Sequence, residues 1–431
     1  MRSNSLLLTA YRTLGYLVAP VLPLFLKRRA KFGKEILNRS HERLGRDYRM
    51  RRPGYLVWVH AASVGEMNAA LGVIRHLTAD GKRVLLTTGT VTSATLARSE
   101  LPDLAQHAFA PLDAAPIIER FLRHWHPDLA IFVESEIWPA MLSSLRRRNI
   151  KTVLINGRLS DRSFAGWDRQ RPFAQSLFST FDLCLVASPE YVDRFQALGA
   201  PRAEWTGNLK YDRPPLAADP ERIEALRSSI GNRTAIVAAS THAGEEDFLF
   251  RSYQAIKSQH PESVLIVVPR HPERGEDVVH LARTHGLVAV QRSQNRELTS
   301  NVDVYVADTL GELGVMYQLA DFAFVGGTLA PRGGQNPIEA ACIGRFVIHG
   351  KHTNNFKDVY RELDDVGAGR LVKTAHDLQE AIGWCIDHPD EVRRGGELGA
   401  ETVDRGRGAL KRTLDALYVV ASDLRDGQAK P

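Results

Sequence analysis

Acidic side chains occur at two points of the sequence with spacings that suit acid–base chemistry. Glu66 lies in the segment HAASVGE, and Glu134 and Glu136 lie in the segment ESEIWP. A carboxylate beside a hydroxyl group can remove its proton, and two neighbouring carboxylates can share a proton or bind sugar hydroxyls. Trp138, in the same segment, offers an apolar face on which a sugar ring can stack. As an alternative, Glu134 holds a neighbouring loop through an ion pair.

The residues around Glu66 allow a second interpretation. The pattern Ser63-x-x-Glu66 matches a capping box, in which each side chain satisfies the backbone N–H of the other at a helix start. A capping box does not require Gly65, and a glycine in the first turn lowers helix stability relative to alanine. The glycine indicates that something approaches the backbone closely. We therefore expect a catalytic role for Glu66, with Ser63 and Gly65 beside it where the other molecule approaches.

Two segments of the second half join hydroxyl and cationic residues. Ser240 and Thr241 begin the segment STHAGEE, where a strand is expected to turn into a helix. Such a turn either directs N–H groups at an anion or caps the helix, and the segment alone does not separate the two. Arg270 and His271 lie in PRHPER at the end of another strand and add positive charge. Arg158, in NGR of the first half, is a further cation whose planar fork suits a carboxylate or a phosphate.

Glycine-rich loops follow later strands. The segment GELG at residues 311–314 is too short and irregular for a dinucleotide fingerprint. The segments GGT and GGQNPIEA place four glycines before a predicted helix start, with Asn336 as N-cap and Pro337 in the first turn. Capping explains these two residues, whereas the glycines predict a backbone that wraps a ligand. A phosphate at the helix N-terminus and a ribose on Glu339 would use that geometry.

Metal and nucleic-acid chemistry find little support. The sequence contains no Asp-x-Asp, and the pair His124-x-His126 has no further ligands nearby, so we expect neither a metal nor a cofactor. No aromatic and basic residues are interleaved as in nucleic-acid-binding modules. The three cysteines lie far apart in the sequence, which fits a reducing compartment.

Short apolar runs must position these residues. Between residues 55 and 188, and again between 234 and 350, such runs alternate with helical patterns, which predicts two parallel sheets of the Rossmann type. In such sheets ligands bind beyond the carboxyl ends of the strands, where most of the polar residues above lie. The segment YDRPPLAADP, residues 211–220, indicates a linker. The expected divisions are listed in order: an anchor at 1–30, an acceptor domain at 31–210, a donor domain at 211–400, and a helix with a frayed tail at 401–431.

The amino terminus combines an apolar run with positive charge. Residues 1–60 contain 13 Lys and Arg against three acidic residues, although the whole chain has a net charge of only +6. Residues 5–26 are apolar except for Arg12 and are followed directly by basic residues. Arg12, Pro20 and Pro23 weaken a straight spanning helix, so we expect the run to lie on an anionic membrane surface, with a spanning or a buried helix as alternatives. The basic residues after the run place the remainder in the cytoplasm.

The motifs together resemble a known family. In order along the chain they are HAASVGE, TTGTVTS, ESEIWP, NGR, GNLK, STHAGEE, PRHPER, GELG and GGQNPIEA. They are similar to those of the transferases of 3-deoxy-D-manno-octulosonic acid (Kdo) in Gram-negative lipopolysaccharide assembly, glycosyltransferase family 30. The resemblance implies a GT-B fold with two Rossmann-like domains facing a central cleft. It also implies metal-independent, inverting transfer of Kdo from CMP-Kdo to a phosphorylated lipid A precursor (lipid IVA), at the cytoplasmic face of the bacterial inner membrane.

The same resemblance assigns expected roles to individual residues. Glu66 is the expected base, and Glu134 and Glu136 belong to a second acidic motif. Lys210, in GNLK, is expected beside the acceptor with Arg158. The expected nucleotide-sugar-binding residues are Ser240, Thr241, Arg270, His271, Gly311, Glu312, Leu313, Gly314, Asn336 and Glu339. The alternatives are another GT-B transferase or an epimerase that uses a uridine nucleotide, and a catalytically silent membrane scaffold.

Overall fold

The computed structural model describes residues 6–294 and 298–421. Within it the chain forms two compact units, one made of Met1–Arg213 with Gly406–Pro431 and the other of Pro214–Arg405. The division after Arg213 falls inside the expected linker, residues 211–220. The last part of the expected tail, residues 422–431, lies outside the described residues.

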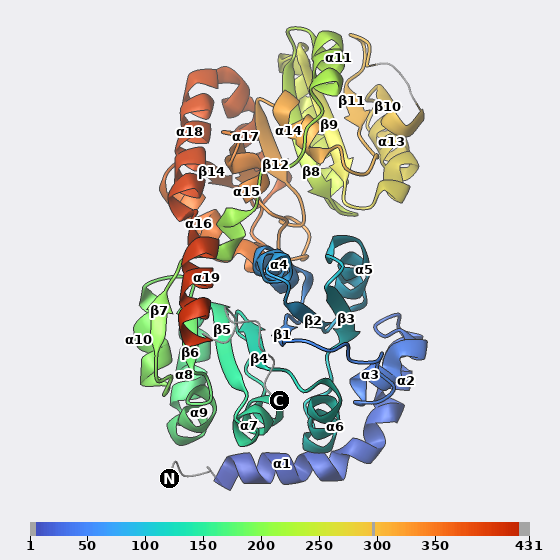
Figure 1. Cartoon of the computed structure of the whole chain (residues 1–431). Coiled ribbons are helices and arrows are strands. Elements are labelled where there is room, and N and C mark those ends of the chain that lie inside the picture. The colour runs from blue at the N-terminus through green and yellow to red at the C-terminus, as the bar shows by residue number, and fades with distance from the viewer. Residues whose placement is uncertain (1–5, 295–297, 422–431) are drawn as a thin grey trace. The chain divides into compact units, whose positions relative to one another are not determined.

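The first unit is built on a seven-stranded parallel sheet with the order β3-β2-β1-β4-β5-β6-β7 (Figure 1). Its central strands are buried on both faces, which is why their sequences are continuous apolar runs such as LAIFV in β4. The strands are β1 (Leu56–His60), β2 (Arg83–Thr88), β3 (Ala105–Phe109), β4 (Leu129–Val133), β5 (Lys151–Gly157), β6 (Leu183–Val186) and β7 (Ala203–Trp205).

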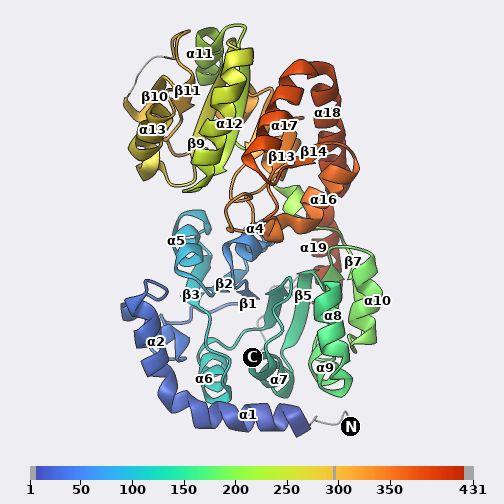
Figure 2. The same cartoon turned by 180° about the vertical axis from the view of Figure 1, so that it is seen from behind.

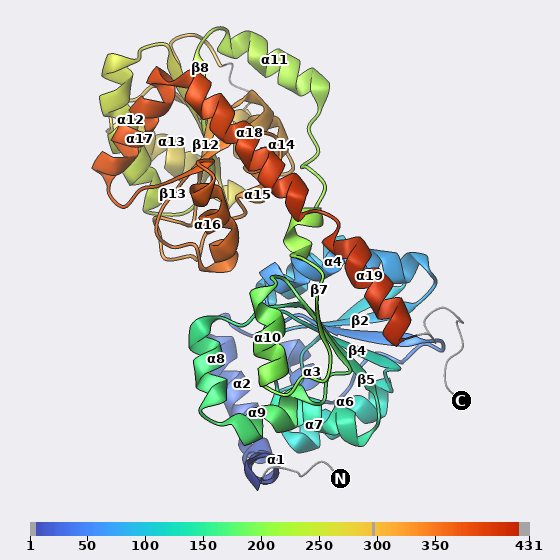
Figure 3. The same cartoon turned by 90° about the vertical axis from the view of Figure 1, so that its left-hand side faces the viewer.

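Helices cover both faces of this sheet and complete two apolar cores. The helices and 3-10 turns after the amino-terminal segment are η2 (Leu37–Arg39), α3 (Ser40–Arg43), α4 (Val64–Ala79), α5 (Val91–Glu100), α6 (Ala115–Trp125), α7 (Pro139–Arg147), α8 (Asp161–Asp168), α9 (Arg171–Phe178), α10 (Glu190–Ala197) and η3 (Leu209–Asp212). The chain returns at the end to this unit as α19 (Ala409–Val420), which packs beside α4 (Figure 3). The Asp212 carboxylate accepts hydrogen bonds from the N–H groups of Gly408 and Leu410 and so fixes the start of α19.

The second unit repeats the architecture with the order β10-β11-β9-β8-β12-β13-β14. All its neighbouring strands are parallel, as the alternating pattern predicted. The strands are β8 (Thr234–Thr241), β9 (Ser263–Pro269), β10 (Ala289–Gln291), β11 (Val304–Val306), β12 (Phe322–Val325), β13 (Phe346–His349) and β14 (Gly369–Leu371). The helices and turns are α11 (Pro220–Ile230), α12 (Glu245–Gln259), η4 (Pro272–Arg274), α13 (Gly275–Thr284), η5 (Arg292–Gln294), α14 (Leu313–Leu319), α15 (Ile338–Ala341), η6 (Asn354–Phe356), α16 (Lys357–Asp365), α17 (Ala375–Asp387) and α18 (Pro389–Gly406).

The amino-terminal apolar run is helical and packs on the first unit. It forms α1 (Leu6–Val18), a 3-10 turn η1 (Ala19–Val21) and α2 (Leu22–Lys31). By length and composition this 26-residue helical run could cross a membrane. One side of α1 lies along α6 and α7 instead (Figure 2).

Polar contacts fasten α1 in that position. The Arg12 guanidinium donates to the hydroxyls of Ser143 and Ser144 on α7, at 2.9 and 3.1 Å. The Tyr11 hydroxyl donates to Asp113, at 2.9 Å. The opposite side of the run remains apolar and exposed, at Leu6, Leu7, Leu14, Leu17, Val21, Leu24 and Phe25.

Candidate active site

The acidic motifs of the first unit meet at one edge of its sheet. HAASVGE follows β1, ESEIWP follows β4 and NGR ends at the carboxyl end of β5, and these three strands are neighbours in the sheet. The strand order reverses between β1 and β4, because the chain continues to one side from β1 and to the other from β4. Ligands of open α/β sheets bind at such a switch point. The expected acidic site is therefore placed where the fold favours a ligand.

Glu66 lies in the first turn of α4 and folds back onto its own loop. Its Oε2 accepts the backbone N–H of Ala62 at 2.7 Å, and its Oε1 accepts the Ser63 hydroxyl at 2.9 Å. The Ser63 Oγ also accepts the Glu66 N–H, at 3.3 Å. The expected capping box is thus only half formed, because the Glu66 carboxylate serves the N–H of Ala62 instead of that of Ser63.

The Glu66 carboxyl is poised to exchange a proton near neutral pH. Burial, followed by the negative charges of Glu136 and Glu134, raises the pKa of Glu66 to about 8, against the donors Ser63 and Ala62. A general base works best with a pKa near the operating pH. Such a perturbed carboxyl, at the switch point of a sheet, is a candidate for catalysis.

Glu136 is held in the opposite state. Its Oε2 accepts the indole N–H of Trp138 and lies 3.3 Å from His60 Nε2. Burial alone would raise the pKa of Glu136, but His60 and Trp138 outweigh it and the pKa lies below its usual value. Two neighbouring carboxyls with pKa values driven apart are the arrangement expected of an acid–base pair.

Glu134 is paired with a buried cation. Its Oε1 lies 2.8 Å from the Lys210 Nζ and accepts the Asn156 amide at 3.3 Å. Both Glu134 and Asn156 have a left-handed backbone, with φ of 59° and 52°. Non-glycine residues in that region carry strain, which is found frequently at functional sites. The alternative role of Glu134 in an ion pair is thereby realised, with the predicted Lys210 as its partner.

The remaining predicted residues of the first unit lie around this cluster. Arg158 is half-buried. Burial lowers the pKa of Lys210, the positive charge of Arg158 lowers it further, and Glu134 opposes the shift. The space in front of Gly65 is open, because an added Cβ would meet only the Ser63 hydroxyl, at 3.8 Å. The structure therefore offers no internal packing reason for Gly65, which fits the close approach of another molecule.

In the second unit, STHAGEE and PRHPER meet at the ends of β8 and β9. His242, which was not predicted as a site residue, stands at the centre of their cations. Burial lowers the pKa of His242 to about 4, and the positive charges of Arg332, His271, Arg270 and Arg274 add to that effect. The predicted residues Arg270 and His271 are thus part of an electropositive cluster that suits an anion.

The sequence left anion binding and helix capping open for the start of α12, and the structure places two buried carboxylates of the protein itself there, Glu245 and Glu246. Glu245 is 1% exposed and accepts five backbone N–H groups, four of them from the loop after β12. Its Oε2 accepts His242 N at 2.9 Å and Gly327 N at 2.7 Å. Its Oε1 accepts the N–H groups of residues 328, 329 and 330, at 3.0, 2.9 and 3.1 Å.

The predicted hydroxyl residues of this loop serve the fold as well. Thr241 donates its hydroxyl to Glu246, which also receives both guanidinium nitrogens of Arg274, at 2.8 and 3.3 Å. Ser240 has a left-handed backbone with φ of 55°. Its carbonyl oxygen would lie 2.5 Å from a Cβ at Gly326, so this glycine is needed by internal packing. The glycine-rich loop is therefore shaped in part by the protein itself.

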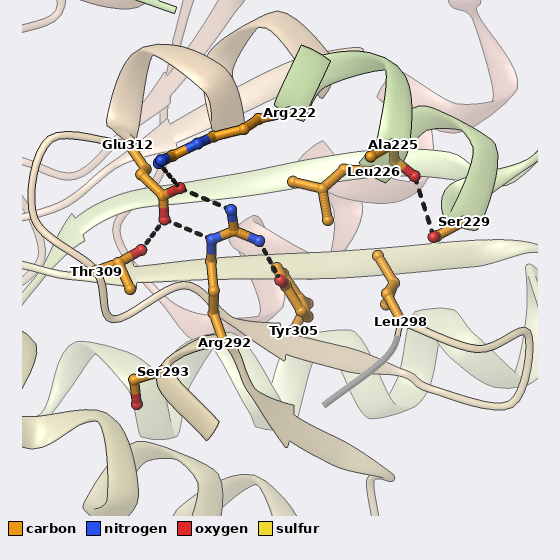
Figure 4. Close-up of a pocket in the computed structure, with 10 residues that line it drawn as sticks. All are labelled: Arg222, Ala225, Leu226, Ser229, Arg292, Ser293, Leu298, Tyr305, Thr309 and Glu312. Carbon is orange, nitrogen blue, oxygen red and sulfur yellow. Dashed lines mark hydrogen bonds and ion pairs between the residues drawn. The ribbon is translucent and has the colours of Figure 1, made fainter. Parts of the chain in front are cut away.

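The GELG motif borders a surface pocket of about 670 Å³ (Figure 4). Arg222 and Arg292 converge there on the Glu312 carboxylate, with Arg292 Nη2 at 2.7 Å and Arg222 Nη1 at 2.6 Å. The Arg292 and Thr309 hydrogen bonds lower the pKa of Glu312 to about 2 against the effect of burial. Glu312 thus holds three of its own neighbours. Gly311 has a φ of 83° and open space in front of it.

The other two residues of that motif are packed. Leu313 starts α14, and a Cβ at Gly314 would lie 2.3 Å from the carbonyl oxygen of Ala217. In the last motif, the Asn336 side chain accepts the N–H of Ile338 at 3.1 Å and donates to Glu339 at 3.1 Å. The two predicted nucleotide-binding residues Asn336 and Glu339 are therefore brought together, beside a helix of only four residues.

The chain is similar to known proteins in sequence and in fold. The sequence profile of the family described as 3-deoxy-D-manno-octulosonic-acid transferase (kdotransferase) matches residues 38–213. The chain is 35% identical over 393 residues to the probable mitochondrial 3-deoxy-D-manno-octulosonic acid transferase of Arabidopsis thaliana, covering 88% of each chain. It is 36% identical over 369 residues to the 3-deoxy-D-manno-octulosonic acid transferase of Haemophilus influenzae, covering 84% of this chain and 86% of that one.

A solved structure supports the fold. The crystal structure of a glycosyltransferase from Rickettsia africae matches with a TM-score of 0.56, at 13% identity, over 86% of this chain and 99% of that one. At this identity the likeness concerns the fold alone. The expected GT-B architecture of two Rossmann-like units is confirmed.

Proposed function

This chain belongs to the family of 3-deoxy-D-manno-octulosonic acid (Kdo) transferases, and we propose on that premise that it transfers Kdo from CMP-Kdo to lipid IVA. The family makes it a glycosyltransferase enzyme. The finer proposal covers the donor, the phosphorylated lipid acceptor, inversion at the anomeric carbon and independence of metal ions. The observation that carries it is the Glu66 carboxyl, whose pKa of about 8 suits a base for the acceptor hydroxyl.

In the proposed reaction one bond forms, one bond breaks and one proton moves. The acceptor hydroxyl oxygen forms a bond to the anomeric carbon of Kdo, the bond from that carbon to the CMP phosphate breaks, and CMP leaves with the electron pair. Glu66 takes the hydroxyl proton. Attack on the face opposite the leaving group inverts the anomeric centre. Glu136 and the Glu134–Lys210 pair are proposed to stabilise the charges that develop during transfer.

The second unit is proposed to bind the donor. CMP-Kdo carries a phosphate and a sugar carboxylate, and the cations around His242 provide a matching positive field. Arg270 and His271 are exposed within that cluster, and Ser240 and Thr241 end strand β8 directly before His242. We assign the ribose and base to the segment 311–314 and to Asn336 and Glu339. The Gly311 backbone is open to such a ligand, whereas the Glu312 carboxylate is occupied by arginines.

The amino-terminal helices are proposed to hold the enzyme on the cytoplasmic face of the bacterial inner membrane. The apolar side chains on the outer side of α1 and α2 are exposed, and Lys27, Arg28 and Lys31 are exposed as well. Apolar side chains with neighbouring cations favour the surface of an anionic bilayer. The contacts of Arg12 with α7 favour a helix that lies on the membrane over one that spans it.

The test uses the purified full chain with CMP-Kdo and a defined tetraacyl acceptor, and measures product mass with and without EDTA. We expect one Kdo increment or more, unaffected by the chelator. CMP is compared with UDP as a ligand, because a uridine nucleotide would indicate the alternative enzymes. Lack of transfer to this acceptor, with CMP-Kdo bound, would refute the assigned acceptor.

Glu66→Gln tests the base. An amide can still accept the Ala62 N–H, so the fold and CMP binding should persist. Turnover should fall about 10² to 10⁴-fold, because glutamine cannot take up the proton. The matched control is Glu224→Gln, which alters an exposed carboxylate of the second unit. Near-normal turnover of Glu66→Gln would remove Glu66 from the mechanism.

A further inference from the structure

His60 is a buried histidine that the acidic motifs alone did not single out. It is the last residue of β1 and is 2% exposed. Its ring lies beside Trp58 and Phe132, with centroid distances of 6.2 and 5.6 Å. Its two nitrogens face different partners: Nδ1 lies 3.0 Å from the hydroxyl of Thr87, and Nε2 lies 3.3 Å from Glu136 Oε2. Nε2 has no partner with hydrogen-bond geometry among the described residues, so its approach to Glu136 is a close polar contact and not a hydrogen bond.

The partners of His60 determine which nitrogen carries the proton. The indole nitrogen of Trp58 can only donate, and it donates to Thr87 Oγ1 at 2.8 Å. The Thr87 hydroxyl then has its own proton to give, and His60 Nδ1 at 3.0 Å is nearer than the Val59 carbonyl at 3.5 Å. A nitrogen that accepts has no proton, so the neutral ring carries its proton on Nε2. That nitrogen is the one that lies 3.3 Å from Glu136 Oε2.

Glu66 has two hydrogen-bond donors, whereas Glu136 has one donor and the close contact with His60. Glu66 accepts from Ala62 N and the Ser63 hydroxyl, and Glu136 accepts from the Trp138 indole while His60 Nε2 faces it. Removal of His60 would leave Glu136 with the indole alone. The number of donors would then favour the negative charge on Glu66, because a hydrogen bond to the charged form stabilises that form.

We propose that His60 is a positioning residue, oriented by Trp58 through Thr87, that keeps Glu136 ionised and thereby raises the proton affinity of Glu66, whose ionised form takes up the proton of the acceptor. This inference rests on the proposed function, because it assumes Glu66 as the base. It adds to the residues proposed to act in transfer a relay of three side chains, Trp58, Thr87 and His60, which lie on β1 and β2. The strand register places His60 directly opposite Thr87, so the sheet itself fixes the relay.

Other charges face the same carboxyls and must be kept constant in a test. Glu134 faces them from the loop after β4 and is paired with Lys210, and Arg158 lies beside Lys210 at the end of β5. Asp113, just before α6, accepts the N–H groups of residues 140 and 141; burial raises its pKa, and His60 is among the groups that oppose this shift, so Asp113 responds to a substitution at His60 as well. The side chains of Glu134, Lys210 and Arg158 are not altered by that substitution.

The direction of the pH effect follows from the pair. In the unaltered enzyme the pKa of Glu136 lies below its usual value and that of Glu66 is about 8, so kcat/KM should rise with pH through about 8. In His60→Phe, Glu66 becomes the first of the two to ionise, while Glu136 is still neutral and does not repel its charge. The rising limb of the profile of kcat/KM against pH should therefore move to lower pH by about one unit or more.

His60→Gln is the matched control. Its amide can accept from Thr87 through Oε1 and donate to Glu136 through Nε2, as the proposed tautomer does. We expect the limb of this variant to stay near that of the unaltered enzyme, whatever its absolute rate. Thermal melting and CMP binding report whether each variant is folded. A limb that is unchanged or raised in His60→Phe, or lowered equally in His60→Gln, would overturn the inference.

A second measurement determines the tautomer of His60 in the unaltered chain, and a variant serves only to assign the signal. The full chain is labelled with ¹⁵N-histidine, and the signal of His60 is identified by its loss in His60→Gln. The expected spectrum shows the ring proton on Nε2 and none on Nδ1. A ring protonated on Nδ1 would overturn the inference even if transfer is observed. Absence of transfer by the unaltered chain would instead refute the proposed function, and the tautomer would still test the relay.

Discussion

Replacement of Glu245 by glutamine should loosen the glycine-rich loop of the second unit. The Glu245 carboxylate accepts five backbone N–H groups in a setting that is 1% exposed. Glutamine keeps one acceptor oxygen but turns an NH₂ group toward the remaining donors. If the oxygen keeps the three N–H groups of residues 328–330, those of His242 and Gly327 lose their acceptor. The opposite orientation would leave three N–H groups unpaired.

The expected cost follows from the number of unpaired donors. A buried donor left without a partner costs about 1–3 kcal/mol, so two of them cost roughly 2–6 kcal/mol. That is a large part of the roughly 5–15 kcal/mol by which a domain is stable. Even the lower value corresponds to an about 30-fold change in an opening equilibrium, since each 1.4 kcal/mol is a factor of ten.

Amide hydrogen exchange measures this effect where it should occur. Exchange of the peptide that contains residues 327–330 should quicken by about 30-fold or more in Glu245→Gln. The denaturation midpoint of the second unit should fall as well. The control is Glu224→Gln, an exposed carboxylate on α11 in the same unit, whose stability should stay within about 0.5 kcal/mol of the original.

One result would refute the reasoning about this loop. If Glu245→Gln protects residues 327–330 as well as the unaltered chain does, and unfolds within about 0.5 kcal/mol of it, the carboxylate does not organise the loop. The glycine-rich loop would then owe its shape to its glycines and to packing. A fall in the denaturation midpoint without faster amide exchange at residues 327–330 would likewise contradict a role of Glu245 in this loop.

Two further predictions concern the donor and the membrane. Glu339→Ala should weaken CMP binding because ribose hydroxyls lose their partner, whereas Glu339→Gln should be milder, and equal affinity of both variants with the original would reduce Glu339 to a partner of Asn336. Leu17→Gln with Leu24→Gln should reduce binding to anionic vesicles about 100-fold or more, since each buried leucine contributes roughly 1.5–3 kcal/mol. Val419→Gln, an exposed apolar residue on α19, is the control and should leave vesicle binding as it was.

Substitution is preferable to truncation for the membrane test. From the sequence, removal of residues 1–30 would release the anchor and leave the core intact. The structure shows Leu8 and Leu26 buried and Tyr11 bonded to Asp113, so the truncation would also expose the core and remove one of the three donors of the Asp113 carboxyl. Residues that face outward test attachment without this cost.

The fold was largely predictable because the central strands have long buried runs. The strands that escaped prediction are β3, β7, β10 and β14, which lie at or near the edges of the two sheets. Three of them have only three residues. The fourth, β3, has the sequence AQHAF, in which three of five residues are half-buried, so no apolar run marks it.

The site was predictable where function required unusual residues in loops, and not where it depended on contacts between distant strands. Glu66 and Glu134 could be found from their positions after apolar runs. His60 is the end of such a run and its partner Thr87 lies on the neighbouring strand, so only the register reveals the relay. Glu245 looked like an ordinary first-turn acid, because the four N–H groups it accepts belong to a loop more than 80 residues away.

In both units a first-turn glutamate makes the same local hydrogen bond, with different consequences. In each, a glutamate in the first turn of the helix after the first strand of the unit reaches back to a backbone N–H of its own loop: Glu66 to Ala62, and Glu245 to His242. Glu245 receives four more backbone N–H groups and is enclosed, so all its hydrogen bonds serve the shape of a loop. Glu66 receives a single further donor, a hydroxyl, and is half-buried beside two other carboxylates. Burial, followed by the negative charges of Glu136 and Glu134, raises the pKa of Glu66 to about 8, and only two donors oppose that shift, so this carboxylate is able to take up a proton.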